Sequence, residues 1–167
     1  MPSIKEAATE FLAHKRLAVT GVSRKPKSHG SNIVYQRLRQ RGYEVFAVNP
    51  NADQVEGDRC YRDLRSIPGG VDAVVIGTSP RFAEGTMREC ADLGIKHVWM
   101  HRAFGKGSVS DAATDYGRQH GITVIDGGCP LMFEPTADGA HQVMRFVFTV
   151  TGKVPRTCEA ARMNLGG

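Results

Sequence analysis

The sequence predicts an α/β domain with a Rossmann-like fold, a three-layer sandwich around a mainly parallel sheet of five strands. Two observations lead to this prediction. Short apolar runs rich in β-branched residues recur along the chain, and amphipathic segments separate them, several of which end at a glycine. This alternation favours right-handed βαβ crossovers and a parallel sheet. The 167 residues suit one domain, which we expect over residues 1–150, followed by a C-terminal extension over 151–167.

The five expected strands are mostly apolar along their whole length, as in AVVIG at 73–77. Continuous apolar runs of this kind are typical of parallel strands that are buried on both faces. The expected strands cover residues 16–22, 44–48, 73–77, 97–100 and 122–125.

The expected helices lie between and around these strands, over residues 3–14, 30–41, 80–93, 108–120 and 136–150. Ser3 and Glu6 have the spacing of a capping box at the start of the first helix. Glycine follows three of the helices, as is common at helix ends; these are Gly42, Gly94 and Gly121. On the last helix the spacing predicts a buried face made by Val143, Phe146, Val147 and Val150.

Composition excludes several classes of function. The net charge is +5, but the basic residues are scattered and the densest group is Arg24, Lys25 and Lys27, which argues against nucleic-acid binding. No apolar run reaches the length of a membrane helix, and the N-terminus lacks a signal-peptide core. The cysteines are far apart, without a CxxC pair, which favours free thiols in a cytoplasmic protein; they are Cys60, Cys90, Cys129 and Cys158.

The loops that follow the strands should form the ligand-binding edge, because open parallel sheets bind ligands beyond the carboxyl ends of their strands. These loops cover residues 21–30, 48–51, 77–82, 101–106 and 126–132.

The first loop is the most informative. Gly21 allows a sharp exit from the strand, Ser23 and Ser28 offer hydroxyls, and Arg24 and Lys25 supply positive charge beside a helix N-terminus. Free N–H groups and the dipole of a helix start attract anions, so we expect this loop to bind phosphate. A solvated turn that binds nothing is the alternative.

The loop matches neither GxGxxG nor GxxxxGK[ST]. The second strand ends at Val48-Asn49-Pro50, where a dinucleotide-binding fold would carry an acidic residue for the ribose. An NAD(P)-dependent oxidoreductase therefore remains only an alternative.

The chain resembles the small stand-alone CoA-binding domain proteins, which are similar to the CoA-binding domain of the succinyl-CoA synthetase α-subunit. The resemblance covers about residues 15–131. It lies in AVTGVSRKP at 18–26, GSNIVY at 30–35, GYEVFAVNP at 42–50, VDAVVI at 71–76, KHVWM at 96–100 and GITVID at 121–126, before Cys129-Pro130.

The resemblance implies that coenzyme A or an acyl-CoA is held across the strand ends of the domain at 1–150. A reaction like that of succinyl-CoA synthetase needs a phosphorylatable histidine domain and an ATP-grasp partner, for which 167 residues are too few, so we expect a binding protein that does not catalyse a reaction. The phosphates would meet Gly21, Val22, Ser23 and Arg24, and Lys25 would reach a phosphate on the ribose. Asn49 and Pro50 would border the adenine, while Thr78, Ser79, Pro80 and Phe82 would line the nucleotide or pantetheine path.

The sequence departs from the pattern of these proteins at HRAFGK (101–106), at DGGCPLMFE (126–134) and in the added helix that contains His141 and Arg145. These departures leave one enzymatic alternative, a thiol-dependent or acyl-CoA activity at Cys129 activated by His101 or Arg102. A buried, inert cysteine is the simpler interpretation. No ligand spacing supports a metal site. The N-terminal helix or the C-terminal extension offers a route to a homodimer.

Overall fold

Helices and strands alternate along the chain. The computed structural model describes residues 2–25, 30–103, 107–137 and 139–151, apart from the side chains at 140, 146, 148 and 149. The elements are α1 (Ile4–Ala13), β1 (Arg16–Thr20), α2 (Gly30–Gln40), β2 (Glu44–Val48), β3 (Gln54–Val55), β4 (Asp58–Tyr61), β5 (Ala73–Ile76), α3 (Pro80–Asp92), β6 (His97–Met100), α4 (Asp111–Gln119), β7 (Thr123–Asp126), the 3₁₀ turn η2 (Pro130–Met132) and α5 (Gly139–Val150).

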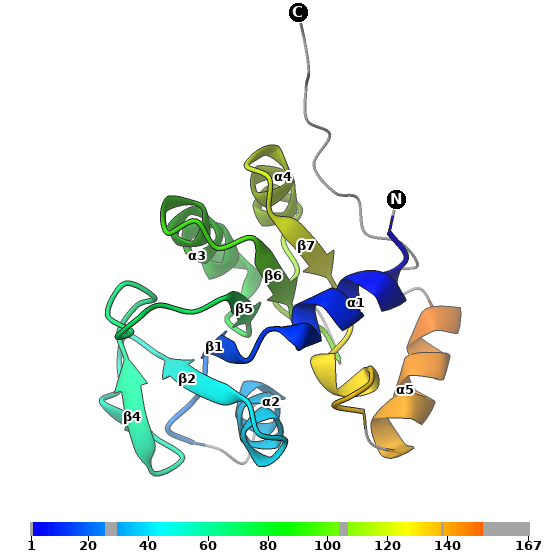
Figure 1. Cartoon of the computed structure of the whole chain (residues 1–167), viewed down its shortest axis with the longest axis horizontal. Coiled ribbons are helices and arrows are strands. Elements are labelled where there is room, and N and C mark those ends of the chain that lie inside the picture. Colours follow the sequence, from blue (N-terminus) through cyan, green and yellow to red (C-terminus); the bar gives the residue numbers. More distant parts are fainter. Residues whose placement is uncertain (1, 26–29, 104–106, 138, 152–167) are drawn as a thin grey trace, which may run out of the picture.

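The strands form one sheet in the order β3-β4-β2-β1-β5-β6-β7 (Figure 1). All neighbours pair in parallel except β3 and β4, which are antiparallel. In the centre Val19 of β1 lies between Ala47 of β2 and Val75 of β5. The predicted fold class is confirmed, and the five predicted strands are all present.

The sheet also contains β3 and β4, two strands more than predicted. β3 has only two residues, and β4 reads DRCY, so neither has the apolar run that marks the other strands. Their hairpin turns at Glu56 and Gly57, whose φ angles are 52° and 79°. This hairpin extends the sheet beyond β2 and brings the segment after β4 to the strand ends.

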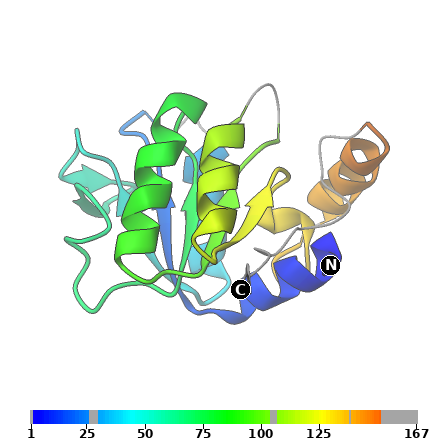
Figure 2. The same cartoon turned by 90° about the horizontal axis from the view of Figure 1, so that it is seen from above.

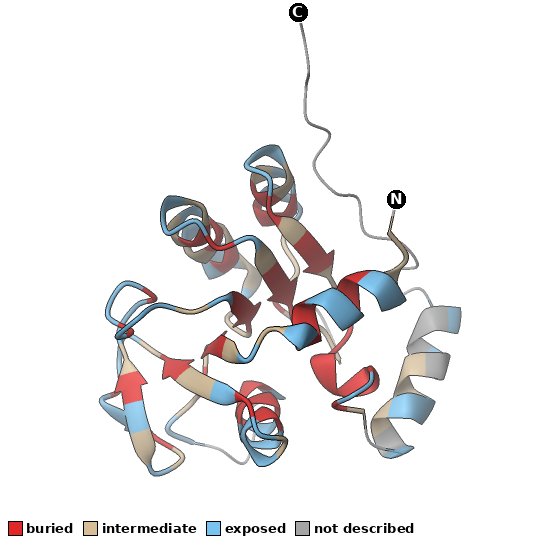
Figure 3. Cartoon of the chain, in the orientation of Figure 1, coloured by how far each residue is buried: buried red, intermediate tan, exposed pale blue. Residues whose placement is uncertain are grey.

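Helices cover both faces of the sheet, which gives the expected three layers (Figures 1 and 2). One apolar cluster joins α1 and α2 to the sheet, and a second joins α3 and α4 to its other face. Figure 3 shows buried residues on the strands and on the inward sides of these helices. The predicted capping box is confirmed, since the Glu6 amide donates to Ser3 Oγ (3.2 Å) and the Ser3 amide donates to Glu6 Oε2 (2.6 Å).

The last helix does not pack as predicted. Val143, Val147 and Val150 are 65%, 47% and 69% exposed, so the expected buried face is wrong for them; the side chain of Phe146 lies outside the described part. The buried Thr136 hydroxyl donates to Pro130 O (2.6 Å), which holds residues 130–136 in a turn before the helix begins. As a result α5 packs on η2 and stands apart from α3 and α4 (Figure 2).

Among the described residues, no helix combines the length and the apolar character that a membrane span needs.

Candidate functional site

Two glycines let the loops after β1 and β5 touch at the strand ends. Gly21 has a φ of +75°, and a Cβ atom there would lie 2.6 Å from Gly77 O and 2.8 Å from the Thr78 amide nitrogen. A Cβ on Gly77 would lie 2.6 Å from the backbone oxygen of Thr20 and 2.1 Å from Ser31 Oγ, at the start of α2. Only glycine fits such close backbone approaches. The first loop, the third loop and the start of α2 therefore meet at one point.

A buried amide holds the first loop in place. Asn32, 1% exposed, accepts a hydrogen bond from the Ser23 amide (2.8 Å) and donates to Ser23 O (2.8 Å). The same Asn32 Nδ2 donates to Glu56 Oε1 in the β3–β4 turn (2.6 Å). Because both backbone groups of Ser23 are bound by one side chain, the loop leaves β1 in a fixed direction.

Two cations of the first loop, Arg24 and Lys25, face solvent. The Lys25 amide donates to Ser23 Oγ (3.0 Å). The amides of Ser23 and Lys25 are thus engaged within the protein, and an anion here would meet the two cationic side chains, the Ser23 hydroxyl and the first N–H groups of α2. The predicted contact at Ser28 lies outside the described residues.

The loop after β2 is tied to the first loop by Asn49. Its Nδ2 donates to Val22 O (2.9 Å), and its Oδ1 accepts from the Asn51 amide (2.9 Å). Gly21 N also donates to Val48 O (3.0 Å). Asn49 therefore shapes the edge of the site, and it stands at the position where a dinucleotide-binding fold would carry an acidic residue.

A pocket of about 460 Å³ opens at these strand ends, on the side of the sheet that α3 covers. Pockets for small ligands fall in the range of roughly 300–1,000 Å³. Thr78 Oγ1, which lines the pocket, is buried and has no hydrogen-bond partner among the described residues, so it is available to a ligand. The lining consists of Thr20, Gly21, Val48, Asn49, Pro50, Asn51, Arg62, Asp63, Leu64, Thr78, Phe82, Gly85, Thr86 and Glu89.

The structure brings together some of the predicted site residues. Those that line the pocket are Gly21, Asn49, Pro50, Thr78 and Phe82. Ser23, Arg24 and Lys25 lie on the adjoining loop, and Val22 is fully buried, so only its backbone faces the site's edge. Ser79 and Pro80 start α3 outside the lining, with Ser79 as the N-cap.

The pocket wall also contains residues that the sequence analysis missed. Gly85, Thr86 and Glu89 lie on α3 at a spacing that places them on one helix face, a signal that the sequence offered. Arg62, Asp63 and Leu64 follow β4, and they reach the site because β4 pairs in parallel with β2. Because β4 was not predicted, no pattern in the sequence placed these three residues at the site.

Cys129 and His101, the nucleophile and the histidine considered for catalysis, are both buried. Cys129 is 2% exposed and belongs to the apolar cluster around Trp99. His101 is 9% exposed, and its Cε1 would lie 3.1 Å from a Cβ at Gly30. Burial, and then the nearby His141, lowers the pKa of His101 to about 4. His101 is thus a neutral, packed imidazole near pH 7.

Metal ligands are not assembled in the described part of the chain, where no group of three or more His, Cys, Asp or Glu side chains is placed to hold an ion. Cys60, Cys90 and Cys129 are all buried.

Known proteins share this architecture. A solved structure of a hypothetical protein from Pyrococcus horikoshii OT3 superposes with a TM-score of 0.65 at 27% identity, over 72% of this chain and 82% of that one. The uncharacterized protein YneT of Bacillus subtilis is 28% identical over 124 residues, 74% of this chain and 88% of YneT.

The α-subunit of ADP-forming acetate–CoA ligase II from Pyrococcus furiosus is 32% identical over 88 residues, 53% of this chain. The chain spans only 19% of the length of that subunit. The model of the CoA binding domain family matches residues 15–135, which include β1 to β7 and η2. The chain therefore belongs to the CoA-binding domain family.

Proposed function

We propose that this protein binds coenzyme A or an acyl-CoA at the carboxyl ends of β1, β2 and β5, as a binding protein that does not itself catalyse a reaction. The phosphates lie against the loop of Gly21 to Lys25 and the start of α2. The adenosine end lies in the pocket under α3, where Pro50 and Phe82 offer apolar surface to the base. We also propose that the protein acts in the cytoplasm, where this ligand is available.

The observation that carries the proposal is the contact between the loops after β1 and β5. The exposed cations Arg24 and Lys25 belong to the first of these loops, which precedes the N-terminus of α2, and the unpartnered Thr78 hydroxyl belongs to the second. A helix start with neighbouring cations suits a pyrophosphate. The adjoining pocket accommodates a nucleoside, so the two parts together suit an adenine nucleotide with a phosphate chain. Membership of the CoA-binding domain family selects CoA among such ligands.

A non-catalytic role is supported by the burial of the groups that chemistry would need. The Cys129 thiol is 2% exposed, and the His101 imidazole is packed against the start of α2. A nucleophile must reach its substrate, and these groups lie below the surface of the site.

Calorimetric titration of the full chain with CoA tests the proposal, with NAD as the comparison ligand. We expect saturable binding of one CoA per chain and much weaker binding of NAD. The Arg24→Ala/Lys25→Ala double variant should bind CoA at least about tenfold more weakly, since each lost charge-assisted contact is worth roughly 1.5–3 kcal/mol and 1.4 kcal/mol is tenfold.

A matched control removes two exposed cations far from the site, Lys5 on α1 and Arg37 near the end of α2. This Lys5→Ala/Arg37→Ala variant has the same net charge as the test variant and should keep wild-type affinity. If both variants bound CoA equally weakly, the loss of affinity would come from net charge and not from a contact with the loop. Absence of CoA binding by the wild type would refute the proposal.

A further inference from the structure

We propose that Arg62 binds the phosphate on the ribose of CoA and so sets the preference for CoA over dephospho-CoA. This inference rests on the proposed function, because it assigns a role within the same site. It moves the ribose-phosphate contact from Lys25, which the sequence suggested, to a residue that the sequence analysis did not consider.

Arg62 is the only cation among the described residues that line the pocket. It is exposed, and the described part of the chain gives it no hydrogen bond, ion pair or ring contact. The neighbouring arginines are engaged: Arg59 lies 5.2 Å from the centre of the Tyr61 ring, and Arg65 pairs with Asp92 (2.9 Å). A planar guanidinium with free N–H groups is well suited to a phosphate.

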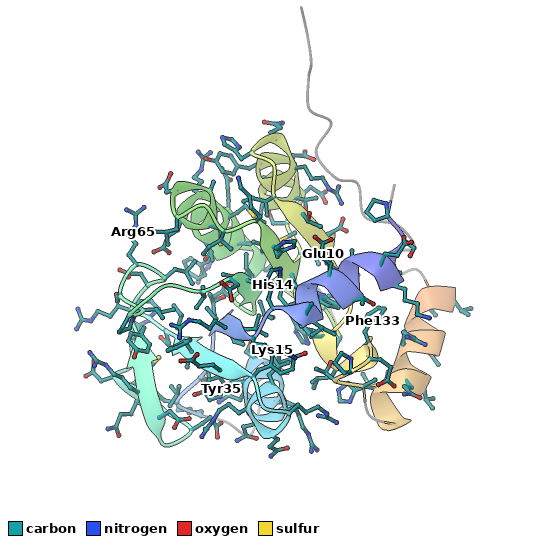
Figure 4. All side chains as sticks on the ribbon, in the orientation of Figure 1. Glu10, His14, Lys15, Tyr35, Arg65 and Phe133 are labelled. Atoms are coloured by element: carbon teal, nitrogen blue, oxygen red, sulfur yellow. The ribbon has the colours of Figure 1, made fainter. Side chains whose placement is uncertain are left out.

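The two carboxylates of the pocket wall are held by the protein itself. Asp63 accepts hydrogen bonds from the amide (2.8 Å) and the hydroxyl of Ser66. Glu89 accepts from the Arg65 amide (3.2 Å) and lies 3.7 Å from the Arg65 guanidinium. Burial raises the pKa of Glu89, whereas the hydrogen bonds from Ser66 lower the pKa of Asp63. Arg65 is labelled in Figure 4, on the segment between β4 and β5. Arg62 therefore supplies the positive charge of the pocket wall, beside the anionic Asp63.

Lys25 lies on a different loop from Arg62 and outside the pocket lining. It belongs to the first loop, which Asn32 ties to α2. Arg62 follows β4, beyond β2, and shares the pocket wall with Pro50 and Asn51. A ligand with its pyrophosphate at α2 and its nucleoside in the pocket therefore presents the ribose end to Arg62 and the phosphate chain to Lys25.

The test compares two ligands that differ by one phosphate. CoA and dephospho-CoA are titrated into the wild type, Arg62→Ala, Lys25→Ala and the control Arg59→Ala, which removes an exposed charge on β4 outside the pocket lining. We expect the wild type to prefer CoA by about tenfold, the value of one charge-assisted contact. Arg62→Ala should bind dephospho-CoA as the wild type does and lose the preference. Lys25→Ala should weaken both ligands equally, and Arg59→Ala should change neither.

Each outcome decides the assignment. A wild-type preference that survives in Arg62→Ala, or that disappears in Lys25→Ala instead, overturns the role of Arg62. Equal binding of both ligands by the wild type also overturns it, while leaving the proposed function intact. Binding of neither ligand by the wild type refutes the proposed function as well.

Discussion

Replacing Gly21 with alanine should lower both the stability of the fold and the affinity for CoA. At this residue the loop after β1 lies against the backbone of the loop after β5. The φ angle of +75° costs an L-residue about 1–2 kcal/mol. The new Cβ would also lie 2.6–2.8 Å from three backbone atoms of Gly77 and Thr78, which no side-chain rotation can relieve. Overpacking of this kind typically adds about 1–3 kcal/mol, so we expect a total loss of about 2–5 kcal/mol.

Gly42 provides the matched control. Its φ is +85°, and a Cβ there would have no atom within 4 Å, so Gly42→Ala carries only the conformational cost of about 1–2 kcal/mol. Urea unfolding of both variants, together with CoA titration, separates the two effects. Gly21→Ala should be the less stable variant and should bind CoA more weakly, whereas Gly42→Ala should keep its affinity. Equal unfolding midpoints and equal CoA affinities of the two variants would show that the close contact of Gly21 with Gly77 and Thr78 does not matter.

Three further predictions concern buried groups. Asn32→Asp places a carboxylate oxygen against Ser23 O and the Glu56 carboxylate, so the free energy of unfolding measured in urea should fall by about 2–4 kcal/mol. A variant as stable as the wild type would contradict the role given to the Asn32 hydrogen bonds. His101 has a pKa lowered to about 4 in the folded state, so its neutral form stabilises the fold above pH 6.5, and this stability is lost as the pH falls toward 4. Between pH 7 and pH 5 the wild type should lose about 2 kcal/mol more than His101→Gln, and parallel losses would exclude His101 as the source. In a Cys158→Ser variant, the remaining thiols should react with a thiol reagent only on unfolding, because all are at most 6% exposed; rapid reaction of the native protein would contradict their burial.

The parts of the fold that the sequence predicted are those where local pattern and tertiary packing agree. β5 is apolar at every position and is buried on both faces, as its sequence indicates. The α1 capping box also formed as predicted, since Ser3 and Glu6 need only local geometry. The prediction of a buried α5 face was wrong because an apolar stripe indicates a helix, while its packing depends on where the preceding turn directs it.

Some residues of the candidate site could also be predicted from the sequence, and others could not. The first loop and the strand-end residues follow from chain order, because the carboxyl ends of parallel strands share one edge. Asn32 and Glu56 could not be assigned, since their partnership joins a helix to a hairpin too short and polar to be recognised. Arg62 follows the same hairpin. Because β4 was not predicted, neither the hydrogen bond between Asn32 and Glu56 nor the place of Arg62 in the pocket wall could be predicted.

A crystal structure of the complex with CoA would show directly whether the ligand binds at this edge of the sheet. We expect electron density for the pyrophosphate between the loop of Gly21 to Lys25 and the first turn of α2, with the adenosine under α3 beside Phe82. Density for CoA on another surface, with this edge of the sheet left empty, would contradict it.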